Sequence, residues 1–226
     1  MIQQLAIIEE PVLERFRVDT IELGRAYMLE DHAWKSWVLP DGTPCKIPAM
    51  VQVEQKGGDW YLLSESGVPL GVQKKGCLYF EQVHFPMADR DFSGQDFGDL
   101  EEQMKQNLWC AVPGPGSHLE LNVAGLRMLA EGAKKLREST DRAIIGLFGG
   151  NLFETPQSLF GMDRYLAYMA LYPEAVIRLS EKLCDIYCRD MEKWLGAVGP
   201  YIDVMLFGDD LGSNQGPLID PGMYRH

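Results

Sequence analysis

The chain has 226 residues, of which 46% are hydrophobic and 24% are charged, a composition close to the average for globular domains. Its formal net charge of −12 disfavours a surface for nucleic acid or anionic membranes, because both of these partners are negatively charged. The sequence has no apolar segment near the roughly 20 residues that span a membrane and no signal-peptide pattern after Met1, so we expect a cytoplasmic protein with one large domain.

The first third of the chain predicts a helical segment and then antiparallel strands. Apolar residues from Leu5 to Phe16 recur at helical spacing, interrupted by Pro11. From 41 to 86, short runs such as MVQVEQ, WYLLS and CLYFEQV alternate with glycine-centred turns. We expect this second segment to be a small antiparallel β-meander inserted into the domain.

Helical patterns resume after the meander. Asp99, with Glu102 three residues later, predicts a helix start. A second helix is expected over about 118–137, because one face is apolar and the basic residues near its end complement the helix dipole.

The last third alternates strands, polar loops and helices, which indicates an α/β fold with parallel strands. The apolar runs 142–149 and 202–207 read as buried strands. Each is followed by a polar loop, 149–155 and 208–216. We expect the two strands to be parallel neighbours with both loops at the same end, where α/β folds place their chemistry.

Three proline-containing pairs are predicted to begin helices in this region. In two of them a Thr or Asp can cap the helix, and in all three the fixed φ of proline suits the first helical turn. The pairs are Thr155-Pro156, Pro173-Glu174 and Asp220-Pro221.

The five cysteines indicate reduced thiols, because their number is odd and no CxxC pair occurs. Cys184 and Cys188 fall on one face of a predicted helix, where they could hold a metal or react. Their apolar neighbours on that helix favour packing as small hydrophobic side chains.

Asp209 and Asp210 are the candidate catalytic residues, because two adjacent carboxylates at the end of a buried strand are costly unless they are bonded. If the two carboxylates lie at the mouth of a barrel, they could polarise a substrate, orient a metal ligand or act as an acid or base. The structural alternative is that one carboxylate accepts backbone amides of the 211–216 loop.

Five further residues are candidates for substrate binding. Gly149, Gly150 and Asn151 permit a close approach of the backbone to a ligand, although a tight strand-to-helix turn explains them equally well. Gln157 and Gln215 carry amides that can donate to a ligand, and a solvated loop side chain is the alternative for Gln215.

Two stretches carry a family resemblance, GLFGGNLFETPQSLFGMDRYLAYMALYPEAVIRL (146–179) and LFGDDLGSNQGPLIDPGMYRH (206–226). They contain, in order, a Gly-rich turn after a strand, a helix with L-x-G, a P-E-x-V helix start, an acid pair after a strand, and a Gly/Gln loop before D-P-x-x-Y. This succession resembles the uroporphyrinogen decarboxylase superfamily. The meander and the stretch YFEQVHFPMAD are similar to its corrinoid-associated methyltransferase branch.

The resemblance implies that residues 1–226 are a partial (β/α)8 barrel of the TIM type, with 41–86 inserted and 142–226 forming βα units. The family's D-R-x-P start and its His-x-Cys zinc pair do not occur in this sequence. We therefore interpret the chain as an internal segment of a longer enzyme that is inactive by itself.

The implied function is methyl transfer that involves a corrinoid protein, with zinc in the intact protein and no cofactor within this chain. One alternative is a lyase, the cofactor-free decarboxylation of a porphyrinogen in tetrapyrrole biosynthesis. Gln157 counts against it, because the decarboxylase carries a functional tyrosine near this position. The other alternative is a non-catalytic fragment or interaction module, and a homodimer is one possible assembly.

Overall fold

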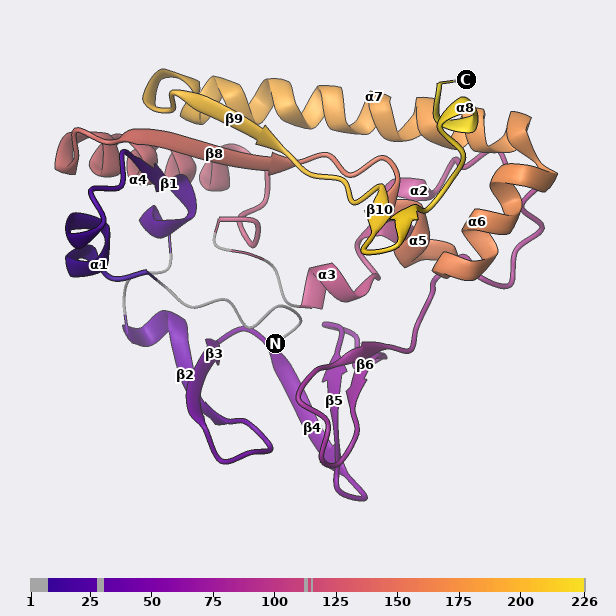
Figure 1. Cartoon of the computed structure of the whole chain (residues 1–226), viewed down its shortest axis with the longest axis horizontal. Coiled ribbons are helices and arrows are strands. Elements are labelled where there is room, and N and C mark those ends of the chain that lie inside the picture. Colours follow the sequence, from indigo (N-terminus) through magenta and orange to yellow (C-terminus); the bar gives the residue numbers. More distant parts are fainter. Residues whose placement is uncertain (1–7, 28–30, 112–113, 115, 226) are drawn as a thin grey trace. The chain divides into compact units, whose positions relative to one another are not determined.

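The computed structural model of the protein describes residues 8–27, 31–111, 114 and 116–225. It is a mixed α/β structure (Figure 1), as the sequence predicted, and its residues divide into two compact units. The first unit comprises Met1–His84, Leu108–Leu147 and Met191–Leu206, and the second comprises Phe85–Asn107, Phe148–Asp190 and Phe207–His226.

A parallel sheet has three strands in the order β1-β8-β9 (Figure 1). They are β1 (Thr20–Glu22), β8 (Ala143–Gly149) and β9 (Val204–Phe207). The sequence did not predict β1, because three residues are too few to show a pattern. The sheet is open, so the strands in the described part of the chain do not form a closed barrel.

Strands β8 and β9 are joined by hydrogen bonds near both of their ends. The N–H of Asp203 donates to the carbonyl oxygen of Ile144 at 2.9 Å, and the N–H of Gly208 donates to that of Gly149 at 3.1 Å. The two arrows point the same way (Figure 1). The prediction of two parallel neighbours with their following loops at one end is therefore confirmed. The expectation that 202–207 is a buried strand was wrong, because Val204, Leu206 and Phe207 of β9 are exposed.

Gly146 in the middle of β8 allows close packing on one face of this strand. A Cβ atom at this position would lie 2.7 Å from Cη2 of Trp194 and 3.1 Å from Cδ1 of Ile202. Trp194 belongs to the long helix α7 (Pro173–Val198). The absence of a side chain at Gly146 is thus what lets the indole lie against the strand.

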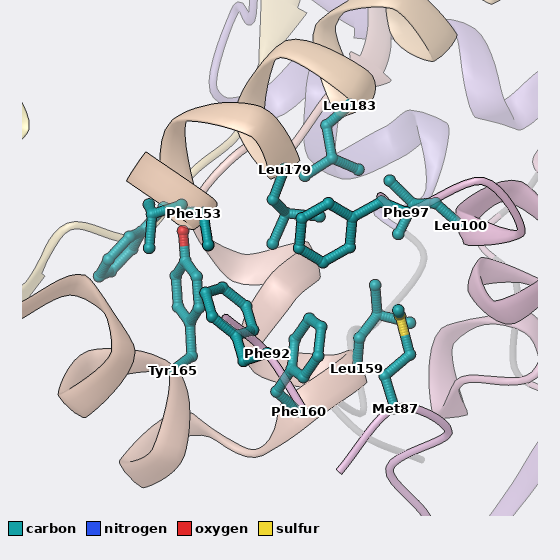
Figure 2. Close-up of a cluster of buried hydrophobic side chains, with 12 residues drawn as sticks. Met87, Phe92, Phe97, Leu100, Phe153, Leu159, Phe160, Tyr165, Leu179 and Leu183 are labelled. Atoms are coloured by element: carbon teal, nitrogen blue, oxygen red, sulfur yellow. The ribbon is translucent and has the colours of Figure 1, made fainter. Parts of the chain in front are cut away.

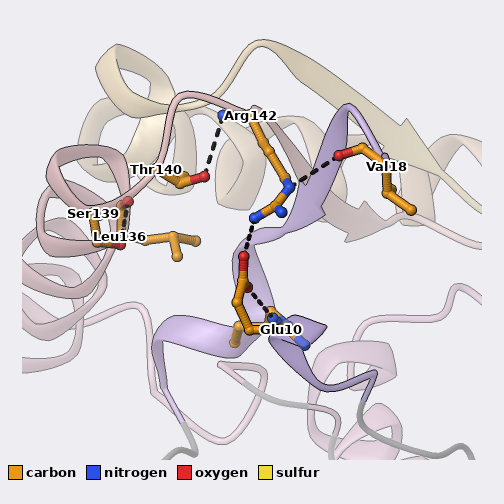
Figure 3. Close-up of polar contacts among 7 residues, drawn as sticks. Glu10, Val18, Leu136, Ser139, Thr140 and Arg142 are labelled. Atoms are coloured by element: carbon orange, nitrogen blue, oxygen red, sulfur yellow. Dashed lines mark hydrogen bonds and ion pairs between the residues drawn. The ribbon is translucent and has the colours of Figure 1, made fainter. Parts of the chain in front are cut away.

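Arg142 joins the start of β8 to the segment that leads into β1 (Figure 3). Its Nε donates to the carbonyl oxygen of Val18 at 2.9 Å, and its guanidinium forms an ion pair with Glu10. Its backbone N–H donates to Oγ1 of Thr140 at 3.2 Å. The contacts with Val18 and Glu10 hold together parts of the chain that are more than 100 residues apart, which local sequence patterns cannot reveal.

The region predicted to be a meander consists of antiparallel strands, as expected. A hairpin of β2 (Trp34–Val38) and β3 (Pro44–Pro48) precedes a sheet in the order β4-β5-β6-β7. The strands of that sheet are β4 (Gln52–Lys56), β5 (Asp59–Leu63), β6 (Pro69–Gln73) and β7 (Glu81–Gln82). Its core is formed by Ile47, Val51, Leu62, Leu70, Phe80 and Leu108. The hairpin begins before residue 41, so the predicted boundary was too late.

The second unit has its own hydrophobic core (Figure 2). Phe92 lies at its centre, stacked on Tyr168 with ring centroids 4.3 Å apart and edge-on to Phe160 at 5.0 Å. The core receives side chains from α2 (Leu100–Met104), α5 (Glu154–Phe160), α6 (Met162–Leu171) and α7. Its buried members are Met87, Phe92, Phe97, Leu100, Phe153, Leu159, Phe160, Tyr165, Ala175, Val176, Leu179 and Leu183.

Most of the predicted helix starts are confirmed. Pro173 is the first residue of α7, and Asp220 caps α8 by accepting the N–H of Gly222 at 2.7 Å. The helix expected over 118–137 begins later, after Asn122. The remaining elements are α1 (Glu10–Arg15), α3 (Leu108–Ala111), α4 (Val123–Ser139), α8 (Pro221–Tyr224), β10 (Gly212–Ser213), β11 (Gly216–Pro217) and the 3-10 turns Leu23–Ala26, Asp31–Ala33 and Gly199–Tyr201.

Two helix starts differ from the prediction. Pro11 does not interrupt a helix, because it lies in the first turn of α1, where its missing N–H costs nothing; Leu5 lies outside the described residues. Thr155 is not a cap, because α5 already begins at Glu154. No helix in the described part of the chain is long and apolar enough to cross a bilayer.

Asp99 precedes α2 as predicted, but its carboxylate binds two side chains and does not cap the helix. The Arg90 guanidinium donates two hydrogen bonds to it, at 2.7 and 2.8 Å, and Gln103 donates a third at 2.9 Å. Hydrogen bonding to Arg90 is the main cause that lowers the pKa of Asp99 to about 2.

This shift predicts an acid-dependent contribution to stability. Because the folded pKa lies below the unfolded value of about 4, the ionised carboxylate stabilises the fold above pH 4, and this stabilisation is lost as the pH falls towards 2. The effect is modest, since the Asp99 side chain is 39% exposed. Urea unfolding should show Asp99→Asn below wild type at pH 6, with the difference shrinking towards pH 2. An equal difference at both pH values would show that the ion pair does not stabilise the fold.

Candidate functional site

The candidate site lies in the second unit, where β8 and β9 end. The loop after β8 is rich in glycine, and the loop after β9 carries the two candidate carboxylates. The second loop folds back on itself, because β10 and β11 pair as a short antiparallel ladder with Ser213 opposite Gly216. Each loop is therefore held by backbone geometry at the same edge of the parallel sheet.

Asp209 binds the two loops together through backbone amides. Its Oδ2 accepts the N–H of Phe153 at 2.8 Å, and its Oδ1 accepts the N–H of Glu154 at 2.9 Å. These are the first amides of α5, whose own cap residue, Phe153, offers no side-chain acceptor. Asp209 thus supplies the cap of α5 from 55 residues away in sequence.

This arrangement matches the kind of contact foreseen as the structural alternative, but with a different partner. The expected amides were those of the 211–216 loop, whereas Asp209 binds amides of the preceding βα unit. A carboxylate at the start of a helix is also favoured by the helix dipole. We assign Asp209 the role of holding the two loops in register.

Asp210 has more freedom than its neighbour. Its Oδ1 accepts the N–H of Gly212 at 3.2 Å, which is an Asx-type turn within the loop. Among the described residues no hydrogen-bond donor reaches its Oδ2, and the side chain is exposed. One carboxylate oxygen of Asp210 is therefore available to a ligand.

Two tyrosines, the buried Tyr165 and the half-buried Tyr187, feel the charge of the Asp209 carboxylate, and the sequence reasoning did not identify them. Burial raises the pKa of Tyr165 above its ordinary value, and the charge of Asp209 adds to the rise. Burial also raises the pKa of Tyr187 to about 12, against the hydrogen bond with Thr155, and the charges of Asp209 and Asp190 add to the shift. Both hydroxyls are protonated at neutral pH, so they can act as donors but not as bases.

Thr155 takes part in this group through its side chain. Its Oγ1 lies 2.7 Å from the hydroxyl oxygen of Tyr187, and either atom can be the donor. The sequence predicted helices that contain the two tyrosines, but no local pattern indicates that the charge of Asp209, more than 20 residues away, acts on them.

Gly149 and Gly150 have φ values of +89° and +71°, which residues with a Cβ rarely adopt. A Cβ at Gly150 would also lie 3.4 Å from Phe148 and 3.6 Å from Phe207. Next to them, Nδ2 of Asn151 donates to Oε2 of Glu154 at 2.5 Å. The tight turn between β8 and α5 is thus sufficient to explain all three candidates.

The two glutamines are not brought together. Nε2 of Gln157 donates to the carbonyl oxygen of Phe153 at 3.1 Å, so this side chain folds back on its own helix. Gln215 is exposed at the tip of the second loop, where its backbone N–H donates to Oγ of Ser213 at 3.2 Å. Of the five predicted binding residues, Gln215 alone is exposed.

The site does not fit a zinc ion. In the part of the chain that the structure describes, no three His, Cys, Asp or Glu side chains lie together as a metal-binding group. One carboxylate of the acid pair is also occupied by backbone amides. No chemical step of this site is therefore derived through zinc.

Comparison of the chain with protein-family models, with curated proteins and with solved structures finds no match.

Proposed function

We propose that the protein is an enzyme of the methyltransferase branch of the uroporphyrinogen decarboxylase superfamily. The proposal rests on the ordered motifs of 146–179 and 206–226 together with the acidic loop at the carboxyl end of β9. The observation that supports it most is that the two carboxylates of the acid pair differ in their contacts. Asp209 accepts hydrogen bonds from two backbone amides, whereas no donor among the described residues reaches one oxygen of Asp210.

The electrostatics of the acid pair favour a substrate that carries positive charge. Two adjacent carboxylates produce a negative potential, and a cationic group beside them is stabilised. A methyl group bound to a positively charged nitrogen or sulfur is such a group, and it is also a good methyl donor. Asp210 would hold the cationic centre, while Asp209 keeps the loop in place.

The three parallel strands would then be neighbouring strands of a (β/α)8 barrel, whose sites lie at the carboxyl ends of the strands. The acceptor would be a corrinoid protein, or a corrinoid would be the donor to a thiol. Zinc, which the family resemblance implies, would need ligands beyond the described residues.

Decarboxylation of a porphyrinogen remains the second candidate, because the Asp210 carboxylate could also stabilise a cationic pyrrole. Against it, Gln157 replaces the tyrosine expected from the resemblance and is bound to its own helix. The third candidate is a non-catalytic interaction module.

Two assays on the full-length natural protein distinguish these candidates. Methyl transfer is followed by the change in visible absorption when methylcobalamin loses its methyl group to a thiol, and decarboxylation by release of CO2 from uroporphyrinogen. We expect methyl transfer above the rate without protein and no CO2. Release of CO2 would establish the second candidate, and activity in neither assay would favour the third.

A further inference from the structure

The exposed face of α7 carries two thiols that the candidate site does not use. Cys184 and Cys188 are both exposed, so the prediction that they pack as small hydrophobic side chains was wrong. Residues four apart on a helix face the same side, with Cβ atoms about 5–6 Å apart. The two sulfur atoms therefore project side by side into solvent.

The helix holds this pair on a rigid support. Leu179 and Leu183, on the opposite side of the same turns, are fully buried in the core of the second unit (Figure 2). The pKa of Cys184 is raised, first by partial burial and then by the charges of Cys188 and Asp185. The contribution of Cys188 shows that the two thiols are close enough to interact. The spacing of the pair is thus fixed by the helix before any ligand binds.

We propose that Cys184 and Cys188 form a two-coordinate site for a soft monovalent metal ion, Cu(I). Thiolates select soft ions, and Cu(I) is the biological ion among them that accepts so few ligands. A two-coordinate ion needs one sulfur atom on each side of it, and two cysteines whose Cβ atoms are about 5–6 Å apart can provide this without moving the helix.

A four-coordinate ion suits the pair less well. Zinc takes four ligands in structural sites, and among the described residues no third His, Cys, Asp or Glu joins the two thiols in a group that could hold a metal ion. Binding of Cu(I) releases one proton from each thiol to solvent, forms two sulfur–copper bonds and leaves a complex with a charge of −1. No electron is transferred, and the inference does not depend on the proposed methyl transfer.

The site is tested by titrating the reduced protein with Cu(I) in anaerobic buffer, against the colorimetric chelator bicinchoninate. Wild type is expected to retain one Cu(I) per chain. Cys184→Ser and Cys188→Ser should each weaken this binding at least tenfold, because each leaves a single thiolate. X-ray absorption should show two sulfur neighbours at the copper.

Cys77→Ser is the matched control, since Cys77 is another exposed cysteine outside α7. This variant should bind Cu(I) like wild type, and circular dichroism should show all three variants folded. Wild-type affinity in Cys184→Ser or Cys188→Ser would overturn the proposal. An equal loss in Cys77→Ser, or no retained copper in wild type, would overturn it as well.

Discussion

Leu159→Ala is expected to lower the free energy of unfolding by about 3 kcal/mol, the largest effect of any change considered for this protein. Leu159 is fully buried in the core of the second unit (Figure 2). The change removes buried methyl groups and leaves a cavity in a core to which helices and loops both contribute side chains. Both the lost transfer free energy and the cavity oppose folding.

Leu171→Ala provides the matched control, because it is the same substitution in the same unit at a leucine that is 66% exposed. Its effect should stay within about 0.5 kcal/mol. Urea unfolding followed by circular dichroism measures both variants. Equal losses in the two would show that the core is not packed as described.

Asp209→Ala is expected to lower the free energy of unfolding by about 2 kcal/mol, because two backbone amides lose a charged acceptor. The amides are those of Phe153 and Glu154, and they have no other side-chain cap. Hydrogen exchange should show faster exchange at both amides in the variant.

Asp210→Ala is the control for this second prediction, since it removes the same charge from the next residue. It loses one longer hydrogen bond within a loop, so its effect on unfolding should be about 0.5 kcal/mol or less. A stability loss in Asp210→Ala as large as that in Asp209→Ala would mean that net charge, and not the cap of α5, explains the effect.

The sequence was sufficient for the elements whose signals are local. Strands β8 and β9 show as apolar runs, and the starts of α7 and α8 show as a proline or an Asp-Pro pair. Strand β1 could not be found in this way, because its three residues are held by pairing with β8 and not by their own pattern. The same holds for the contacts of Arg142, whose partners are distant in the chain (Figure 3).

The position of the two loops at one end of the parallel strands was predictable, but the contacts of the acid pair were not. Asp209 and Asp210 do follow a strand, but that strand, β9, is mostly exposed and is not the buried strand that its apolar run suggested. The start of α5 was misplaced at Thr155, because its cap comes from Asp209 and no local residue indicates it. Tyr165 was missed for the same reason. The exposure of the α7 thiols was missed because helical spacing defines a face but does not show what covers it.

The central claim is that Asp209 and Asp210 have separate roles. Its most direct test is to measure turnover and melting temperature on the same preparations of Asp209→Asn and Asp210→Asn, made in the full-length natural protein. If Asp210 holds the substrate as proposed, Asp210→Asn should lower kcat by about 100-fold with an unchanged melting temperature, because it removes the charge that would hold the cationic centre. Asp209→Asn should lower the melting temperature, with turnover falling only as far as the folded fraction falls. Wild-type turnover in Asp210→Asn would contradict the account and remove this carboxylate from the mechanism.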